Sequence, residues 1–206
     1  ENVYFYYDAI YWILLIPVLI LSVYAKIKVS SSFSRYSRER SRRGITGAQA
    51  AYEVLRAHGV HDVAIRPCAG ELTDHYDPRD NTIYLSQPVY NAATVAAVGV
   101  AAHEAGHAVQ YAMGYAPVRM RSAIIPVTQF GSQFAFIALM LGLFLYSQPL
   151  FLVGIVLFGL TTLFQLVTLP VEFNASARAL GTIEGANLLD EDERRGARKV
   201  LTAAAL

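Results

Sequence analysis

Three long apolar segments dominate the pattern of hydrophobic and polar positions along the chain. They cover residues 6–25, 124–146 and 150–171. A helix needs roughly 20 apolar residues to cross a hydrocarbon layer of about 30 Å, so each segment is long enough to span a bilayer. No charged residue occurs between Arg121 and Glu172, and residues 147–149 provide a turn there. We therefore predict at least three transmembrane helices, the last two forming a tight hairpin.

Between the first two spans, residues 44–121 have the mixed composition of a water-exposed region with short elements. Thr46 is a good N-cap for a helix through Ala57, because a side-chain oxygen there accepts from the first free N–H groups. Turn-rich residues 77–81 separate two β-prone stretches and predict a hairpin. The expected order is a helix at 46–57, a strand at 62–65, hairpin arms at 71–76 and 82–85, and a helix at 94–113 ended by Gly114.

Composition agrees with a membrane protein, and the distribution of charge predicts its orientation. The 206 residues are 54% hydrophobic, and the mean hydropathy of +0.35 is high for a soluble domain. Seven Lys and Arg residues lie between Lys26 and Arg43, with only Glu39 to oppose them. Positive flanks stay in the cytoplasm, so we expect residues 26–43 and Arg121 on that side. We expect this juxtamembrane segment to contact anionic lipid headgroups of the bilayer, and we expect no nucleic-acid partner.

The strongest chemical signal is His103-Glu104-Ala105-Gly106-His107, which lies within the predicted 94–113 helix. Positions four apart share one helical face, so both imidazoles can bind one zinc ion. Glu104 is placed to act as general base and then general acid in peptide-bond hydrolysis by metal-activated water. The alternative is two histidines one turn apart by chance, packed against polar groups. The single cysteine, Cys68, excludes an internal disulfide and a multi-cysteine zinc site.

A catalytic zinc ion takes three protein ligands and keeps one open position. Glu172 stands out as a third ligand because it is the first charge after the uncharged residues 122–171. The alternative is an ordinary charge that marks the end of a span. His75 either faces solvent on the hairpin or contacts the substrate, and Arg178 either stabilises an oxyanion or pairs with Glu184 or a headgroup. The candidates for the third ligand are His58, His61, Asp74, His75, Asp77 and Glu172.

Five stretches of the chain carry a resemblance to a known family. They are Phe5-Tyr-Tyr-Asp8, Leu72-Thr-Asp-His-Tyr-Asp-Pro78, Leu85-Ser86, Ala101-Ala-His-Glu-Ala-Gly-His-Ala108 and Leu169-Pro-Val-Glu-Phe-Asn-Ala-Ser176. With them the chain resembles the YugP-type neutral zinc metallopeptidases of bacterial membranes, and its order of motifs is similar to the HtpX-type and prenyl-protein-type membrane gluzincins. The resemblance implies a mainly α, multi-pass protein of the bacterial cytoplasmic membrane, with a small α+β zincin-like catalytic domain at the cytoplasmic face.

The resemblance also implies a ligand set, in which His103, His107 and Glu172 bind one zinc ion. Ser176 is a departure, since the gluzincin relatives carry there an Asp that orients a histidine ligand. We therefore expect that support to be weaker here or to come from elsewhere. A further hydrophobic segment near the C-terminus is implied as well. Residues 172–206 are interpreted as the third-ligand helix and the start of that segment.

The function expected is zinc-dependent endopeptidase activity at the cytoplasmic membrane surface, on protein or peptide substrates that include membrane proteins. If the strand at 82–85 is a free edge, an extended peptide can pair with it through main-chain hydrogen bonds. One alternative is an intramembrane protease whose third ligand is an Asp in another span. A second is a non-catalytic membrane scaffold. The sequence identifies neither the substrate nor a regulatory membrane partner.

Overall fold

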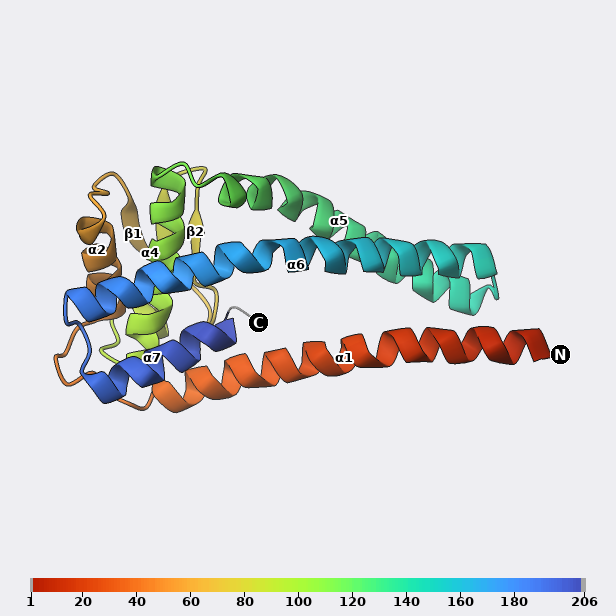
Figure 1. Ribbon diagram of the computed structural model, residues 1–206, viewed down its shortest axis with the longest axis horizontal. Helices are drawn as coiled ribbons and strands as arrows, with labels where there is room; N and C mark the ends of the chain where they lie inside the picture. The colour runs from red at the N-terminus through yellow and green to blue at the C-terminus, as the bar shows by residue number, and fades with distance from the viewer. Residues whose placement is uncertain (1, 205–206) are drawn as a thin grey trace.

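The computed structural model describes residues 2–204 and consists mainly of helices with one small sheet (Figure 1). Its elements are α1 (Asn2–Tyr36), α2 (Gly47–Ala57), β1 (Ala64–Cys68), β2 (His75–Asp77), β3 (Thr82–Ser86), α3 (Gln87–Tyr90), α4 (Val95–Ala112), α5 (Ala116–Phe144), α6 (Gln148–Gly185) and α7 (Glu191–Ala204). The predicted combination of long helices and a small α+β part is therefore observed.

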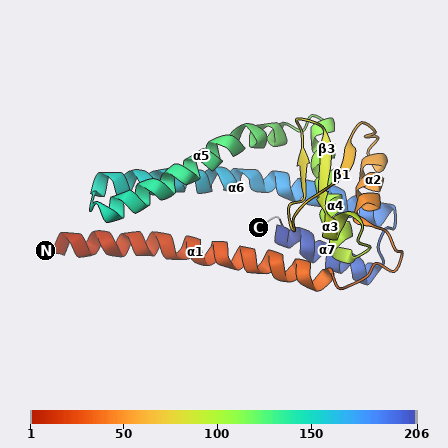
Figure 2. The same cartoon turned by 180° about the vertical axis from the view of Figure 1, so that it is seen from behind.

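A compact head carries three long helices that project in one direction (Figure 1). The head consists of α2, α3, α4, α7, the sheet and the adjoining ends of α1, α5 and α6. Figure 2 shows the same arrangement from behind, with α1 and the α5–α6 hairpin extending from the head in the same direction. Any site in the head therefore lies at one end of the projecting helices.

The α5–α6 hairpin provides two helices that are long and apolar enough to cross a membrane. Only 11% of the apolar window of each helix is buried, which distinguishes the two helices from core helices of a soluble domain. The two helices approach closely, because a Cβ at Gly154 would lie 2.8 Å from the backbone nitrogen of Leu139. Small residues at such contacts are typical of membrane helix pairs. The predicted helices at 124–146 and 150–171 are observed, and both are longer than predicted.

The first predicted span, residues 6–25, lies within α1, which continues as one helix to Tyr36. Many side chains of its first half lie outside the described residues, so this span stays a prediction. The lipid contact expected for residues 26–43 stays a prediction, and the end of this segment also contacts the head. Arg42 pairs with Asp192 at 2.8 Å, and its backbone N–H donates to the buried Glu193 carboxylate. This contact fastens the end of the basic segment to the start of α7.

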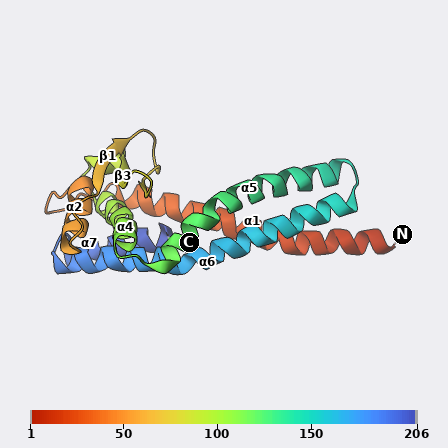
Figure 3. The ribbon, with the colours of Figure 1, turned by 90° about the horizontal axis from the view of Figure 1, so that it is seen from above.

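The sheet has the strand order β1-β3-β2, with β1 parallel and β2 antiparallel to β3. Figure 3 shows β1 and β3 in the head, above α4. The predicted hairpin is confirmed, although its first arm contains only three paired residues. The strand predicted at 62–65 begins two residues later. The condition considered for residues 82–85, a free edge for peptide pairing, is not met, because β3 pairs on both sides and is largely buried. The exposed edge nearest to α4 belongs to β2.

Helix α4 lies at the centre of the head, in contact with α2, α6, α7 and the sheet. Its N-cap, Thr94, accepts a hydrogen bond from the Ala97 N–H, and Gly114 with φ +66° follows its end. Most of its residues are buried, and many are Ala, which allows neighbouring helices to approach. The predicted caps of α4 and of α2 are confirmed, since Thr46 forms a capping box with Gln49. The head therefore surrounds a slender helix that carries both candidate histidines.

Candidate metal centre

His103 and His107 lie one turn apart on α4, and both are buried. Their rings meet edge to face, with centroids 4.6 Å apart and an interplanar angle of 82°. The two Nε2 atoms are 3.1 Å apart. The helical spacing therefore brings both imidazoles to one point, as the sequence predicts.

Glu172 on α6 brings a carboxylate to the same point. Its Oε2 lies 3.2 Å from Nε2 of His103 and 3.3 Å from Nε2 of His107. Zinc–ligand bonds of about 2.0–2.1 Å in a tetrahedron place ligand atoms roughly 3.3–3.4 Å apart. The triangle formed by these three atoms matches that spacing closely. The donor set, two imidazoles and one carboxylate, therefore fits a zinc ion with one further position.

The second nitrogen of each imidazole has its own partner. Nδ1 of His103 lies 3.1 Å from the Ser176 hydroxyl, and Nδ1 of His107 lies 3.0 Å from Oε1 of Gln110. The amide of Gln110 is oriented by its Nε2, which donates to the Val171 carbonyl at 2.8 Å. Because Oε1 can only accept, His107 is protonated on Nδ1 and leaves Nε2 free for a metal. Ser176 thus takes the place of the expected Asp, and Gln110 supplies support from elsewhere.

A close contact between α4 and α6 places Glu172 beside the two histidines. A Cβ at Gly106 would lie 2.5 Å from the Ala175 carbonyl oxygen, too close for any side chain. Gly106 lies between the two histidines in sequence, and Ala175 lies one turn after Glu172. The glycine therefore sets the separation of the two helices at the point where the three ligand atoms meet.

Glu104 contacts the sheet and also interacts electrostatically with His103 and Glu172. Its Oε2 accepts a hydrogen bond of 3.0 Å from the backbone N–H of Tyr76 in β2. Desolvation raises the pKa of Glu104 to about 7, against the opposing influence of His103 and the Tyr76 hydrogen bond. A carboxylate with this pKa can both accept and return a proton near neutral pH.

The other candidates for the third ligand have different partners. Asp74 accepts from the Ser86 N–H at 2.8 Å, and Asp77 pairs with Arg79 at 2.7 Å. That pairing lowers the pKa of Asp77 to about 2. His58 Nδ1 lies 2.9 Å from the Val54 carbonyl at the end of α2, while His61 is exposed. Among the described residues, these side chains stay outside the cluster of metal-binding groups.

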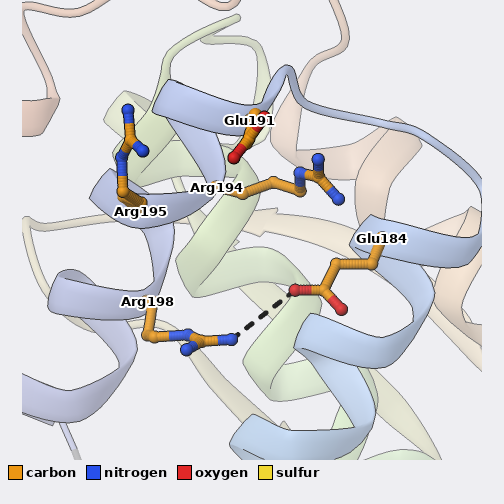
Figure 4. A pocket seen from close by; sticks show the side chains of 5 residues that line it. All are labelled: Glu184, Glu191, Arg194, Arg195 and Arg198. Atoms are coloured by element: carbon orange, nitrogen blue, oxygen red, sulfur yellow. Dashed lines mark ion pairs between the residues drawn. The ribbon is translucent and has the colours of Figure 1, made fainter.

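Among the described residues, neither His75 nor Arg178 has a hydrogen bond or ion pair with the three ligand side chains. His75 is exposed and stacks on Tyr84 with ring centroids 5.2 Å apart. Arg178 donates to Asn174 at 2.9 Å. The pair of Arg178 with Glu184, one of the alternatives considered, is not formed, and Glu184 pairs instead with Arg198 at 3.6 Å (Figure 4).

A cavity of about 280 Å³ lies between α6 and α7, and Figure 4 shows the side chains that line it. It is lined by Glu184, Glu191, Arg194, Arg195 and Arg198. Neither of the two histidines nor Glu172 lines it. This cavity is therefore separate from the candidate metal centre.

Arg121, like Gln110, is a residue of the site whose role was not predicted from the sequence. Its Nη2 lies 2.7 Å from Oε1 of Glu172, the oxygen that does not face the histidines. The sequence contained a usable signal, because Arg121 is the last charge before the uncharged stretch and Glu172 is the first after it. A helical hairpin returns the chain to its starting level, so its two flanking charges are brought together.

Comparisons with known proteins agree with this centre. Residues 11–206 match the family described as "Putative neutral zinc metallopeptidase". The chain is 44% identical over 193 residues to the "Putative membrane protease YugP" of Bacillus subtilis (strain 168), an alignment that covers 94% of this chain and 86% of that protein. No solved structure matches the chain. The match over nearly the whole length shows that the chain belongs to the "Putative neutral zinc metallopeptidase" family.

Proposed function

We propose that the chain is a zinc-dependent endopeptidase that acts at the cytoplasmic surface of the bacterial membrane. The observation that carries this proposal is the convergence of three ligand atoms, from His103, His107 and Glu172, beside the Glu104 carboxylate. A structural zinc site normally fills four positions with protein ligands and has no use for a neighbouring carboxylate. Cleavage of an unfolded membrane protein by the purified chain tests the activity, with Glu104→Gln as the inactive counterpart.

The side chains of the site divide the work of hydrolysis. When bound, a zinc ion supplies Lewis-acid chemistry, which polarises the scissile carbonyl and makes water more acidic. His103, His107 and Glu172 hold the ion through one atom each. Glu104 accepts the proton of the attacking water and then delivers a proton to the leaving amine.

The β2 edge is the surface along which the substrate binds. Tyr76 faces Ile83 in the antiparallel pair, and its N–H points away from β3 to the Glu104 carboxylate. An extended peptide that pairs with this edge runs past Glu104 and the ligand triangle. Main-chain pairing gives little preference for particular side chains, which suits the degradation of many unfolded segments.

Replacing Tyr76 by Pro is expected to reduce cleavage by roughly 10- to 100-fold, the effect of losing one hydrogen bond to a charged group. Proline removes the N–H that donates to Glu104 but is tolerated on an edge strand where the N–H is not part of the ladder. Tyr76→Ala is the matched control, since it removes the ring and keeps the N–H. The measurement is the cleavage rate at equal zinc content. Equal rates for the two variants would contradict a role for this N–H.

Membrane attachment is supported by the hairpin and by the distribution of basic residues. The two apolar helices leave the head together, and Arg119 and Arg121 lie at the head end of α5. Positive charge at that end favours a cytoplasmic head. The hairpin turn is then on the outer side, and α1 crosses the membrane as a further span.

Labelling of cysteines with a membrane-impermeant maleimide is expected to report this orientation. The one native cysteine, Cys68 in β1, is partly exposed and is expected to react only after the cells are permeabilised. A Cys68→Ser, Gln148→Cys variant carries its thiol at the exposed hairpin turn and is expected to react in intact cells. Reaction of Cys68 in intact cells would place the head outside and overturn the orientation.

The intramembrane alternative has less support. Helix α4 is enclosed by α2, α7 and the sheet, which are elements with many charged residues. The carboxylate at the centre is Glu172, just beyond the predicted span, whereas residues 124–146 and 150–171 contain no Asp. These placements favour a site in water at the base of the hairpin.

A further inference from the structure

The two oxygens of the Glu172 carboxylate have different partners, and one of them forms an ion pair with Arg121. Arg121 on α5 holds Oε1 at 2.7 Å, while Oε2 faces both imidazoles at 3.2 and 3.3 Å. The Arg121 side chain is 29% exposed and the Glu172 side chain 15%. The pair is therefore partly shielded from water, unlike most surface ion pairs.

We propose that Arg121 is a positioning residue that keeps Glu172 bound to the metal through a single oxygen. This inference rests on the proposed function. A carboxylate can bind a metal through one or both oxygens. A guanidinium hydrogen bond occupies Oε1 and fixes the plane of the carboxylate, so that only Oε2 faces the metal position. The fourth position of the site then stays open for water.

The location of Arg121 gives this contact a second consequence. Arg121 lies near the start of α5 and Glu172 lies far along α6, so both are distant from the turn that connects the two helices. The ion pair therefore fastens the head ends of both helices at the metal centre. Metal affinity depends in this way on how the hairpin helices are held together.

Arg119 offers a matched control on the same helix. It lies two residues before Arg121, carries the same charge and is exposed. Its guanidinium lies beside Gly114, and the structure records no ion pair between it and Glu172. Substitution of Arg119 by Gln removes the same charge near the site as substitution of Arg121 by Gln does, but it keeps the ion pair between Arg121 and Glu172.

Zinc affinity, measured by competition with a chromogenic chelator, is expected to fall 10- to 100-fold in Arg121→Gln, the usual effect of losing a residue that orients a ligand. Arg119→Gln is expected to bind zinc as the wild type does. Arg121→Lys restores a donor and is expected to recover part of the affinity. Cobalt bound in place of zinc gives a second readout, because its visible absorption weakens when four-coordination changes to five-coordination.

If Arg121→Gln has the same zinc affinity and cobalt spectrum as Arg119→Gln, Arg121 does not position Glu172. The proposed metal centre would still stand in that case. A wild-type protein that does not bind zinc would overturn both this role and the proposed function. If the Gln variant does not fold by circular dichroism, Arg121→Met replaces it, since Met retains an apolar stem without a donor. A wild-type cobalt spectrum for that variant would likewise reject the role.

Discussion

Glu104→Gln is expected to retain a full zinc complement and to lose peptidase activity by roughly 10²- to 10⁴-fold, the usual contribution of a general base. The Glu104 carboxylate faces the Tyr76 N–H and lies outside the ligand triangle. An amide of the same shape can still accept that hydrogen bond, but it cannot take a proton from water. The measurements are zinc per chain by metal analysis and the rate of cleavage of an unfolded membrane protein.

A control for this experiment changes a carboxylate elsewhere in the head. Glu184 lies near the end of α6 and pairs with Arg198, in the cavity that is separate from the centre (Figure 4). Glu184→Gln is expected to keep both zinc and activity. Full activity of Glu104→Gln with its metal retained would remove the basis for the hydrolytic mechanism. Loss of zinc in that variant would instead show that Glu104 helps to bind the metal.

The sequence predicts most strongly those features that depend on neighbouring residues. The spacing of His103 and His107 places both rings on one helical face whatever surrounds the helix. Thr46 and Gly114 mark helix ends because capping is a local interaction. The long uncharged stretch likewise predicts two helices and the turn between them. These elements were expected from the sequence and are present in the structure.

Features that depend on contacts across the fold could not be derived in the same way. Whether residues 82–85 form a free edge was left as a condition, because the order of three strands depends on which pairs form in space, and β3 is central. In the sequence Gln110 has no feature that distinguishes it from other helical residues, because its role depends on the contact between α4 and α6. Nor does the sequence mark the end of helix α6, because the helix continues beyond the predicted span and through Glu172 without a break.

The third ligand, Glu172, was predicted partly from the sequence and partly depends on contacts across the fold. Its identity was inferred from its position after an uncharged span and from a family resemblance, and several other His and Asp residues remained open. The structure brings Glu172 to the histidines because a hairpin returns α6 to the head and Gly106 allows a close helix contact. The choice of Glu172 therefore depends on long-range packing, and it can be tested independently of activity.

Glu172→Ala is expected to weaken zinc binding by at least about 100-fold, since zinc sites with apparent binding energies of about 10–16 kcal/mol owe several kcal/mol to each ligand. The variant also leaves Arg121 without its partner, so some loss of stability in the metal-free protein is expected. Affinity is measured by chelator competition, and the zinc-dependent rise in Tm gives a second measure. His61→Ala, which removes an exposed candidate, is expected to leave both unchanged.

The two variants together distinguish a site with three ligands, His103, His107 and Glu172, from a site formed by the two histidines alone. If His103 and His107 alone bound the metal, Glu172→Ala would keep most of its affinity and its rise in Tm with zinc, and the third ligand would have to be sought elsewhere. A loss in Glu172→Ala but not in His61→Ala supports a centre built from both α4 and α6. Such a centre forms only when the hairpin is in place, which links metal binding to the two helices that are long and apolar enough to cross a membrane.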